Sequence, residues 1–248
     1  MKEKYINEHL ELMQEWLGSY QMTNKNTNFA VDGIIDPATW FSLGLEQERI
    51  LILLKEAYDS TKNRIWDQTK WLTKRRCTDS CDKSFQCESC GATGYTFNTV
   101  AYWIHGIQQI NNGRELEYDE HLNAGKDGFE ATRNDLLKRC AIVNVKKTDG
   151  KSKTDEHELY YAVSKDEMFL KKQIEIINPT VIICGNTYGM LRCLYHEMEK
   201  LDNMSDGNTL FKGVKVIAAC HPNRRSKQKD KFDLVVKNYK ELLGKQLD

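Results

Sequence analysis

The sequence predicts an α/β protein in which helices cover both faces of a central parallel sheet. Four short apolar runs, each of strand length, recur along the 248 residues at 50–54, 141–145, 180–184 and 214–220. Segments with helical spacing of apolar residues separate these runs, and alternation of strands with helices favours a parallel sheet. We therefore expect a three-layer α/β/α fold around a four-stranded parallel sheet.

The expected helices follow the apolar periodicity. Residues 2–17 place Ile6, Leu10, Met13 and Leu17 on one stripe, and Gly18 is expected to end this helix. Asp36-Pro37 is typical of an N-cap followed by proline at the first helical position, and Asp32-Gly33 is typical of a turn. Further helices are expected at 94–110, 129–139, 159–177, after Gly185, and at 229–243.

Length and composition favour a single domain spanning 1–248, with residues 1–45 as an N-terminal helical extension. The 36 basic and 36 acidic side chains balance, so only local patches can indicate a nucleic-acid partner. No apolar run approaches the ~18 residues of a membrane span. The start of the chain lacks the apolar core of a signal peptide, so we expect a cytoplasmic protein with reduced cysteines.

Four of the eight cysteines form a compact cluster at 77–90, inserted after the first core strand. The spacing is Cys77-x3-Cys81-x5-Cys87-x2-Cys90. Tetrahedral zinc takes four such thiolates, and an iron–sulfur cluster is the runner-up. Four unligated thiols are the remaining alternative. We expect a structural zinc knuckle, because a complete four-cysteine set leaves no open coordination position.

Polar side chains follow or end three of the apolar runs. Glu56 and Asp59 come after the first, Asn144 lies in the second, and His221 follows the fourth. In open α/β sheets, ligands bind beyond the carboxyl ends of the strands. The two carboxylates therefore indicate either a catalytic site or a helix N-cap. An asparagine in a buried strand requires hydrogen-bond partners, so Asn144 is either structural or a base-reading amide.

Five segments, taken in order, resemble motifs of the uracil-DNA glycosylase superfamily from about residue 30 onward. They are Lys55-Glu-Ala-Tyr-Asp59, Gly94-Tyr-Thr-Phe97, Ile142-Val-Asn144-Val-Lys-Lys, Asn178-Pro-Thr-Val-Ile-Ile-Cys-Gly185 and His221-Pro-Asn-Arg-Arg-Ser226. The resemblance implies a monofunctional DNA glycosylase that hydrolyses the N-glycosidic bond of a flipped-out uracil or modified pyrimidine and leaves an abasic site.

The resemblance also implies a role for each residue. Glu56 or Asp59 would activate water, and His221 would stabilise the leaving base. Tyr58, Phe97 and Asn144 would bind the base. The residues expected to contact DNA are Lys146, Lys147, Arg224, Arg225, Ser226 and Lys227. Simpler alternatives are a structural His221, a Phe97 in the core of a helix, and a solvated arginine loop.

The chain departs from the superfamily pattern in the motif that activates water and in the loop after His221. Lys55 replaces the usual Gly, Tyr58 the usual Pro, and Arg224-Arg225 the usual small or apolar wedge. These changes favour a base other than plain uracil, as in related enzymes that attack modified phage DNA.

The alternative function is a catalytically inert, zinc-containing nucleic-acid-binding protein with the same fold. A zinc deaminase is excluded, since the sequence has no His-x-Glu followed by Pro-Cys-x-x-Cys. We expect a monomer with no membrane segment and no organic cofactor.

Overall fold

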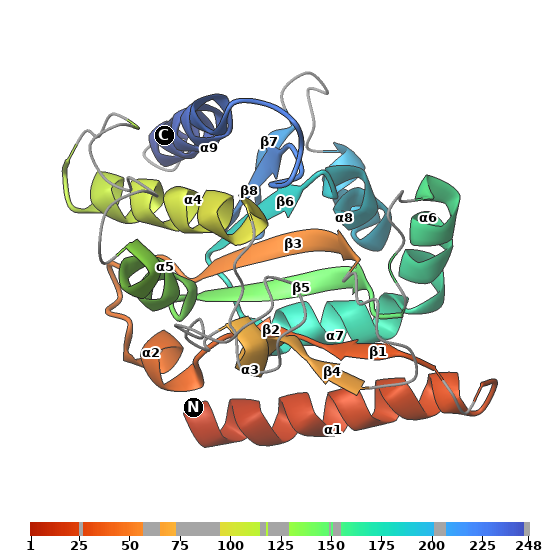
Figure 1. Cartoon of the computed structure of the whole chain (residues 1–248). Helices are drawn as coiled ribbons and strands as arrows, with labels where there is room; N and C mark the ends of the chain where they lie inside the picture. Colours follow the sequence, from red (N-terminus) through yellow and green to blue (C-terminus); the bar gives the residue numbers. More distant parts are fainter. Residues whose placement is uncertain are drawn as a thin grey trace.

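The computed structural model describes residues 1–24, 27–56, 65–72, 95–114, 118, 129–148, 150, 155–200 and 207–245. This part of the chain forms a mixed α/β structure with one large sheet between two groups of helices (Figure 1). None of its helices combines the length and the apolar composition needed to cross a membrane.

The large sheet has six strands in the order β2-β5-β3-β6-β8-β7. Its four central strands run parallel, which confirms the predicted mostly parallel α/β sheet. The expected number of four was too low, because short antiparallel strands pair at both edges. The strands are β2 (Gly33–Ile34), β3 (Ile50–Glu56), β5 (Cys140–Lys146), β6 (Val181–Gly185), β7 (Asn208–Phe211) and β8 (Val214–Ala219); β1 (Phe29–Val31) and β4 (Ile65–Asp67) pair separately.

Different helices cover the two faces of the sheet (Figure 1). One face packs against α4 (Tyr95–Asn111), α5 (Phe129–Leu137) and α9 (Gln228–Gly244). The other packs against α1 (Lys2–Gln21), α6 (Glu156–Lys165), α7 (Glu167–Ile177) and α8 (Tyr188–Leu194). Shorter helical segments are α2 (Pro37–Ser42), α3 (Gln68–Leu72) and the 3-10 helix η2 (His196–Lys200).

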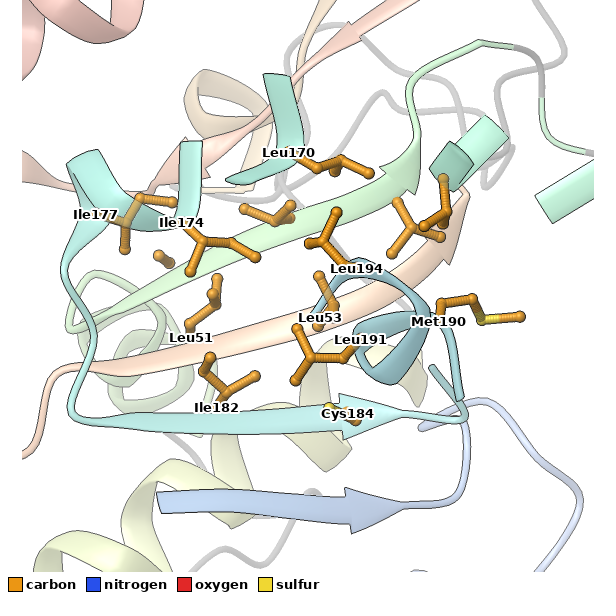
Figure 2. Packing of buried hydrophobic residues seen from close by; sticks show 14 of the residues in the cluster. Leu51, Leu53, Leu170, Ile174, Ile177, Ile182, Cys184, Met190, Leu191 and Leu194 are labelled. Carbon is orange, nitrogen blue, oxygen red and sulfur yellow. The ribbon is translucent and has the colours of Figure 1, made fainter. Parts of the chain in front are cut away.

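Strand β3 lies at the centre of the sheet and contributes to both hydrophobic cores. Ile50 and Ile52 face α4 and α9, whereas Leu51 and Leu53 face α7 and α8. Figure 2 shows Leu51 and Leu53 beside the apolar residues of α7 and α8. Burial on both faces explains why this strand has a continuous apolar sequence rather than an alternating one.

The structure differs from the expected elements at three places. Helix α1 continues past Gly18 to Gln21, since one glycine costs a helix only about 1 kcal/mol. The expected helix at 159–177 is two helices, and the Asp166 carboxylate between them accepts a hydrogen bond from the Tyr20 hydroxyl at 2.6 Å. Asp32 alone separates β1 from β2, and Gly33 is the first residue of β2, so the expected turn does not form. The Asp36 cap is confirmed, because its carboxylate accepts from the Ala38 amide at 2.9 Å.

Two helical glycines give a matched test of the packing between α4 and α9. A Cβ on Gly106 would lie 2.7 Å from Phe232 Cε2 and 2.8 Å from Val236 Cγ2, whereas one on Gly18 would meet nothing within 4 Å. We expect Gly106→Ala to lower the free energy of unfolding by about 1–3 kcal/mol through overpacking. Gly18→Ala should raise it by about 0.5–1 kcal/mol. Urea denaturation measures both, and a stabilising Gly106→Ala would contradict this close approach.

Candidate functional site at the carboxyl ends of the parallel strands

The order of the parallel strands places a topological switch point at the carboxyl end of β3. The chain passes from β3 to β5 through helices on one face, and from β6 to β8 through α8 on the other. Strands β5 and β6 pair with β3 on opposite sides. Ligands of open α/β sheets bind where the connections diverge in this way. Glu56, the last residue of β3, lies at this place.

A close approach at Gly185 brings the loop after β8 onto the end of β3. A Cβ on Gly185 would lie 2.8 Å from Leu54 Cδ2 and 3.1 Å from Pro222 Cδ, so a larger residue would separate them. The neighbouring Asn186 adopts a left-handed φ of 61°, and its amide donates to the Ala219 carbonyl at 2.8 Å. His221, which precedes Pro222, is thereby held at the same edge of the sheet as Glu56.

Glu56 forms an ion pair across the strand ends. Lys146 Nζ lies 3.2 Å from Glu56 Oε2 and 3.3 Å from Glu158 Oε2 on α6. The side chains of Lys146 and Glu56 are only 11% and 7% exposed. Lys146, expected to contact DNA, therefore lies between two carboxylates and holds Glu56 at the strand end.

The His221 imidazole accepts one hydrogen bond and has a lowered pKa. Its Nδ1 accepts from the Asn223 amide at 3.2 Å, so a neutral ring carries its proton on Nε2. Burial, followed by the charges of Lys55 and Lys231, lowers the pKa of His221 to about 4. The ring therefore stays uncharged at neutral pH while Nε2–H remains able to donate.

Residues 223–227 are solvent-exposed, as phosphate contact requires. They include the predicted DNA-binding residues Arg224, Arg225, Ser226 and Lys227. The backbone here is ordered into turns, since the Arg224 amide donates to the His221 carbonyl at 2.9 Å and the Ser226 amide to the Arg224 carbonyl at 2.8 Å. The cationic side chains thus project from a fixed loop beside the imidazole.

Asn144 is held by other buried polar groups. Its side chain is 1% exposed, and Nδ2 donates to Asp32 Oδ2 and to Gln68 Oε1, both at 2.9 Å. An amide nitrogen carries two hydrogens, so both are used within the protein. This geometry favours the structural alternative for Asn144, because reading a base through Nδ2 would require breaking one of these bonds.

Asp32 is the centre of this buried network. Its Oδ2 accepts from the backbone amide of Asn144 at 2.8 Å, as well as from Nδ2. Its Oδ1 accepts from Gln173 Nε2 at 2.9 Å and from Lys147 Nζ at 2.5 Å. Sequence reasoning missed Asp32, since an Asp-Gly pair is typical of turns and its partner Lys147 lies 115 residues away.

Lys147, which we expected to contact DNA, is buried and paired in this structure. The side chains of Lys147 and Asp32 are both 0% exposed. The ammonium also donates to the Asn144 carbonyl at 2.9 Å and lies 4.9 Å from the centre of the Trp16 ring. It is therefore sealed between β5 and α1 and cannot reach a phosphate.

The other predicted site residues are either in the core or not described. Phe97 is 8% exposed and belongs to the core between the sheet and α4, which agrees with its alternative assignment to the helix core. Within the described ranges, the structure contains no group of three or more side chains that could together bind a metal ion. Tyr58, Asp59, Cys77, Cys81, Cys87 and Cys90 lie outside those ranges, so their predicted roles stay predictions.

Comparison of the chain with models of known protein families gives no match, and comparison with curated proteins gives none either. Its function is therefore inferred from the residues at the strand ends.

Replacing Lys147 by Met tests the buried ion pair, because it leaves the Asp32 carboxylate without its counter-ion. We expect the free energy of unfolding to fall by about 3–5 kcal/mol in urea denaturation. The matched control is Lys171→Met, since Lys171 and Glu167 also lie 2.5 Å apart but at the surface. That variant should stay near wild-type stability. Equal losses in the two variants would contradict a special role for the buried pair.

The titration of His221 tests its environment. NMR of the imidazole should give a pKa of about 4, below the ordinary 6.5. Between these values the unfolded chain binds a proton that the folded chain does not, so this group makes stability fall as the pH falls from about 6.5 through 4. His221→Gln should reduce that acid sensitivity. A measured pKa at or above 6.5 would contradict the buried, neutral ring.

Proposed function

We propose that the protein is a monofunctional DNA glycosylase that removes a flipped-out uracil or modified pyrimidine and leaves an abasic site. The observation that carries this proposal is the position of two polar groups at the same edge of the sheet, beyond the carboxyl ends of parallel strands. One is the Glu56 carboxylate at the end of β3, and the other is the imidazole of His221 after β8, whose neighbour Pro222 packs close to Leu54 of β3 at Gly185. A fold of the uracil-DNA glycosylase type is part of the proposal, supported by the four central parallel strands.

The chemistry of base removal matches these two groups. Cleavage of an N-glycosidic bond builds positive charge on the sugar and negative charge on the departing base. Nε2–H of His221 would donate a hydrogen bond to the developing anion, as donors of an oxyanion hole do. The Glu56 carboxylate would position water and offset the charge on the sugar. Asp59 remains an equal candidate for the second role.

Three exposed cations would hold the DNA backbone. Arg224, Arg225 and Lys227 lie on the loop that follows His221, and their side chains are exposed. Phosphate contacts of this kind fix the position of a protein on DNA without reading its sequence. We further propose that the four-cysteine segment holds a structural zinc, on the basis of its spacing alone.

A second candidate function is an inert nucleic-acid-binding protein of the same architecture. Two observations favour it: Lys146 neutralises Glu56, and the amide of Asn144 is fully engaged by Asp32 and Gln68. The exposed arginine loop would serve this function equally well. Base release distinguishes the two candidates, since only an enzyme produces abasic sites.

The deciding experiment measures free base and alkali-labile sites after incubation with uracil-containing DNA and with phage DNA carrying natural base modifications. We expect release from modified DNA. His221→Ala and Glu56→Gln should each lower the rate by about 10²–10³. The matched controls His196→Ala and Glu197→Gln change exposed residues and should leave the rate unaltered.

Each result of this experiment indicates a different function for the protein. Release from uracil DNA would make it a repair enzyme, and release from modified DNA alone would indicate phage defence. Intact DNA binding without release from either substrate would reject the glycosylase and favour the inert binding protein.

A further inference from the structure

A buried lysine lies beneath the loop that carries His221. Lys231 is in the first turn of α9, and only 2% of it is exposed. Its ammonium donates to the Pro222 carbonyl at 2.7 Å and to the Arg224 carbonyl at 2.6 Å. These two carbonyl groups flank the turn between the imidazole and the exposed arginines.

Burying this ammonium is energetically unfavourable unless groups of the loop compensate for its lost hydration. Removing a cation from water costs several kcal/mol even after relaxation. The amino end of a helix carries partial positive charge, which opposes a cation in its first turn. Short hydrogen bonds to two carbonyl oxygens offset part of this cost, because charged donors form stronger bonds than neutral ones. The ammonium and the loop therefore stabilise each other.

Helix α4 also contributes hydrogen bonds to this arrangement. The Thr99 hydroxyl donates to the Pro222 carbonyl at 3.3 Å, so this oxygen accepts from both α4 and α9. The Trp103 indole donates to the Lys231 carbonyl at 3.1 Å and fixes the start of α9 against α4. Lys231 thus extends from an anchored backbone to the base of the loop.

We propose that Lys231 is a positioning residue whose buried ammonium shapes the 221–226 loop and so aims the His221 imidazole and the exposed arginines at the ligand. This inference rests on the proposed function for what the ligand is. The geometry of the loop itself does not depend on that function. After burial and the charge of Lys55, the charge of Lys231 also contributes to the lowered pKa of His221.

The test replaces Lys231 by Met, with Lys215→Met as the matched control. Lys215 is also nearly buried, at 6% exposed, but its ammonium pairs with Glu48 Oε1 at 2.9 Å near the amino end of the sheet. Both variants lose a buried ammonium, so both are expected to be less stable. Only Lys231→Met should alter the loop. If Lys231→Met does not fold, Lys231→Gln, which keeps an uncharged donor, is measured in its place.

Two measurements are independent of enzymatic activity. In Lys231→Met, the pKa of His221 should rise from about 4, although burial and the charge of Lys55 continue to lower it. The Arg224 amide, which donates to the His221 carbonyl, should exchange with solvent about tenfold faster. In Lys215→Met neither should change. With an active substrate, Lys231→Met should lower kcat by roughly 10–100-fold with little change in KM.

The outcomes separate this inference from the proposed function. A folded Lys231 variant with an unchanged His221 titration and unchanged Arg224 exchange would overturn the positioning role, even if the wild type releases bases. Changes in both measurements with no base release from the wild type would support the positioning role and reject the glycosylase.

Discussion

The carboxylate of Asp32 joins parts of the chain that are remote in sequence. It is fully buried, and its two oxygens accept hydrogen bonds from the backbone and side chain of Asn144, from Gln173 of α7 and from Lys147. A charge in this position is tolerated only when such bonds replace its lost water. Since Lys147 in turn lies over the Trp16 ring of α1, the network fixes both α1 and α7 against the edge of the sheet.

The charged residues have different roles at the two ends of the sheet. At the amino ends, the Glu48 carboxylate accepts hydrogen bonds from Lys215, Tyr239 and Thr180, and these side chains tie β6, β8 and α9 to the start of β3. At the carboxyl ends, Glu56 and its partner lie at the same edge of the sheet as a loop whose cations are exposed. The first arrangement uses its charges to hold the protein together. The second leaves charges available to a ligand, which is why we place the chemistry there.

The sequence predicted the parallel strands well because burial on both faces requires a continuous apolar run. Strands β3, β5, β6 and β8 all correspond to such runs. The edge strands β2 and β7 were missed because they are short, and their pairing depends on tertiary contacts. The pair of Asp32 with Lys147 left no local signal either. Each residue had a more obvious local interpretation, as part of a turn and as part of a basic strand end.

Two adjacent lysines with the same predicted role lie in different surroundings in the structure. Lys146 and Lys147 were both assigned to DNA, yet Lys146 pairs with Glu56 and Glu158, whereas Lys147 pairs with Asp32. Successive side chains of an extended strand point to opposite faces, so neighbouring lysines enter different environments. Neither ammonium is then well placed for a phosphate. An anionic ligand would instead meet the exposed cations after His221, whose loop is shaped by the buried Lys231.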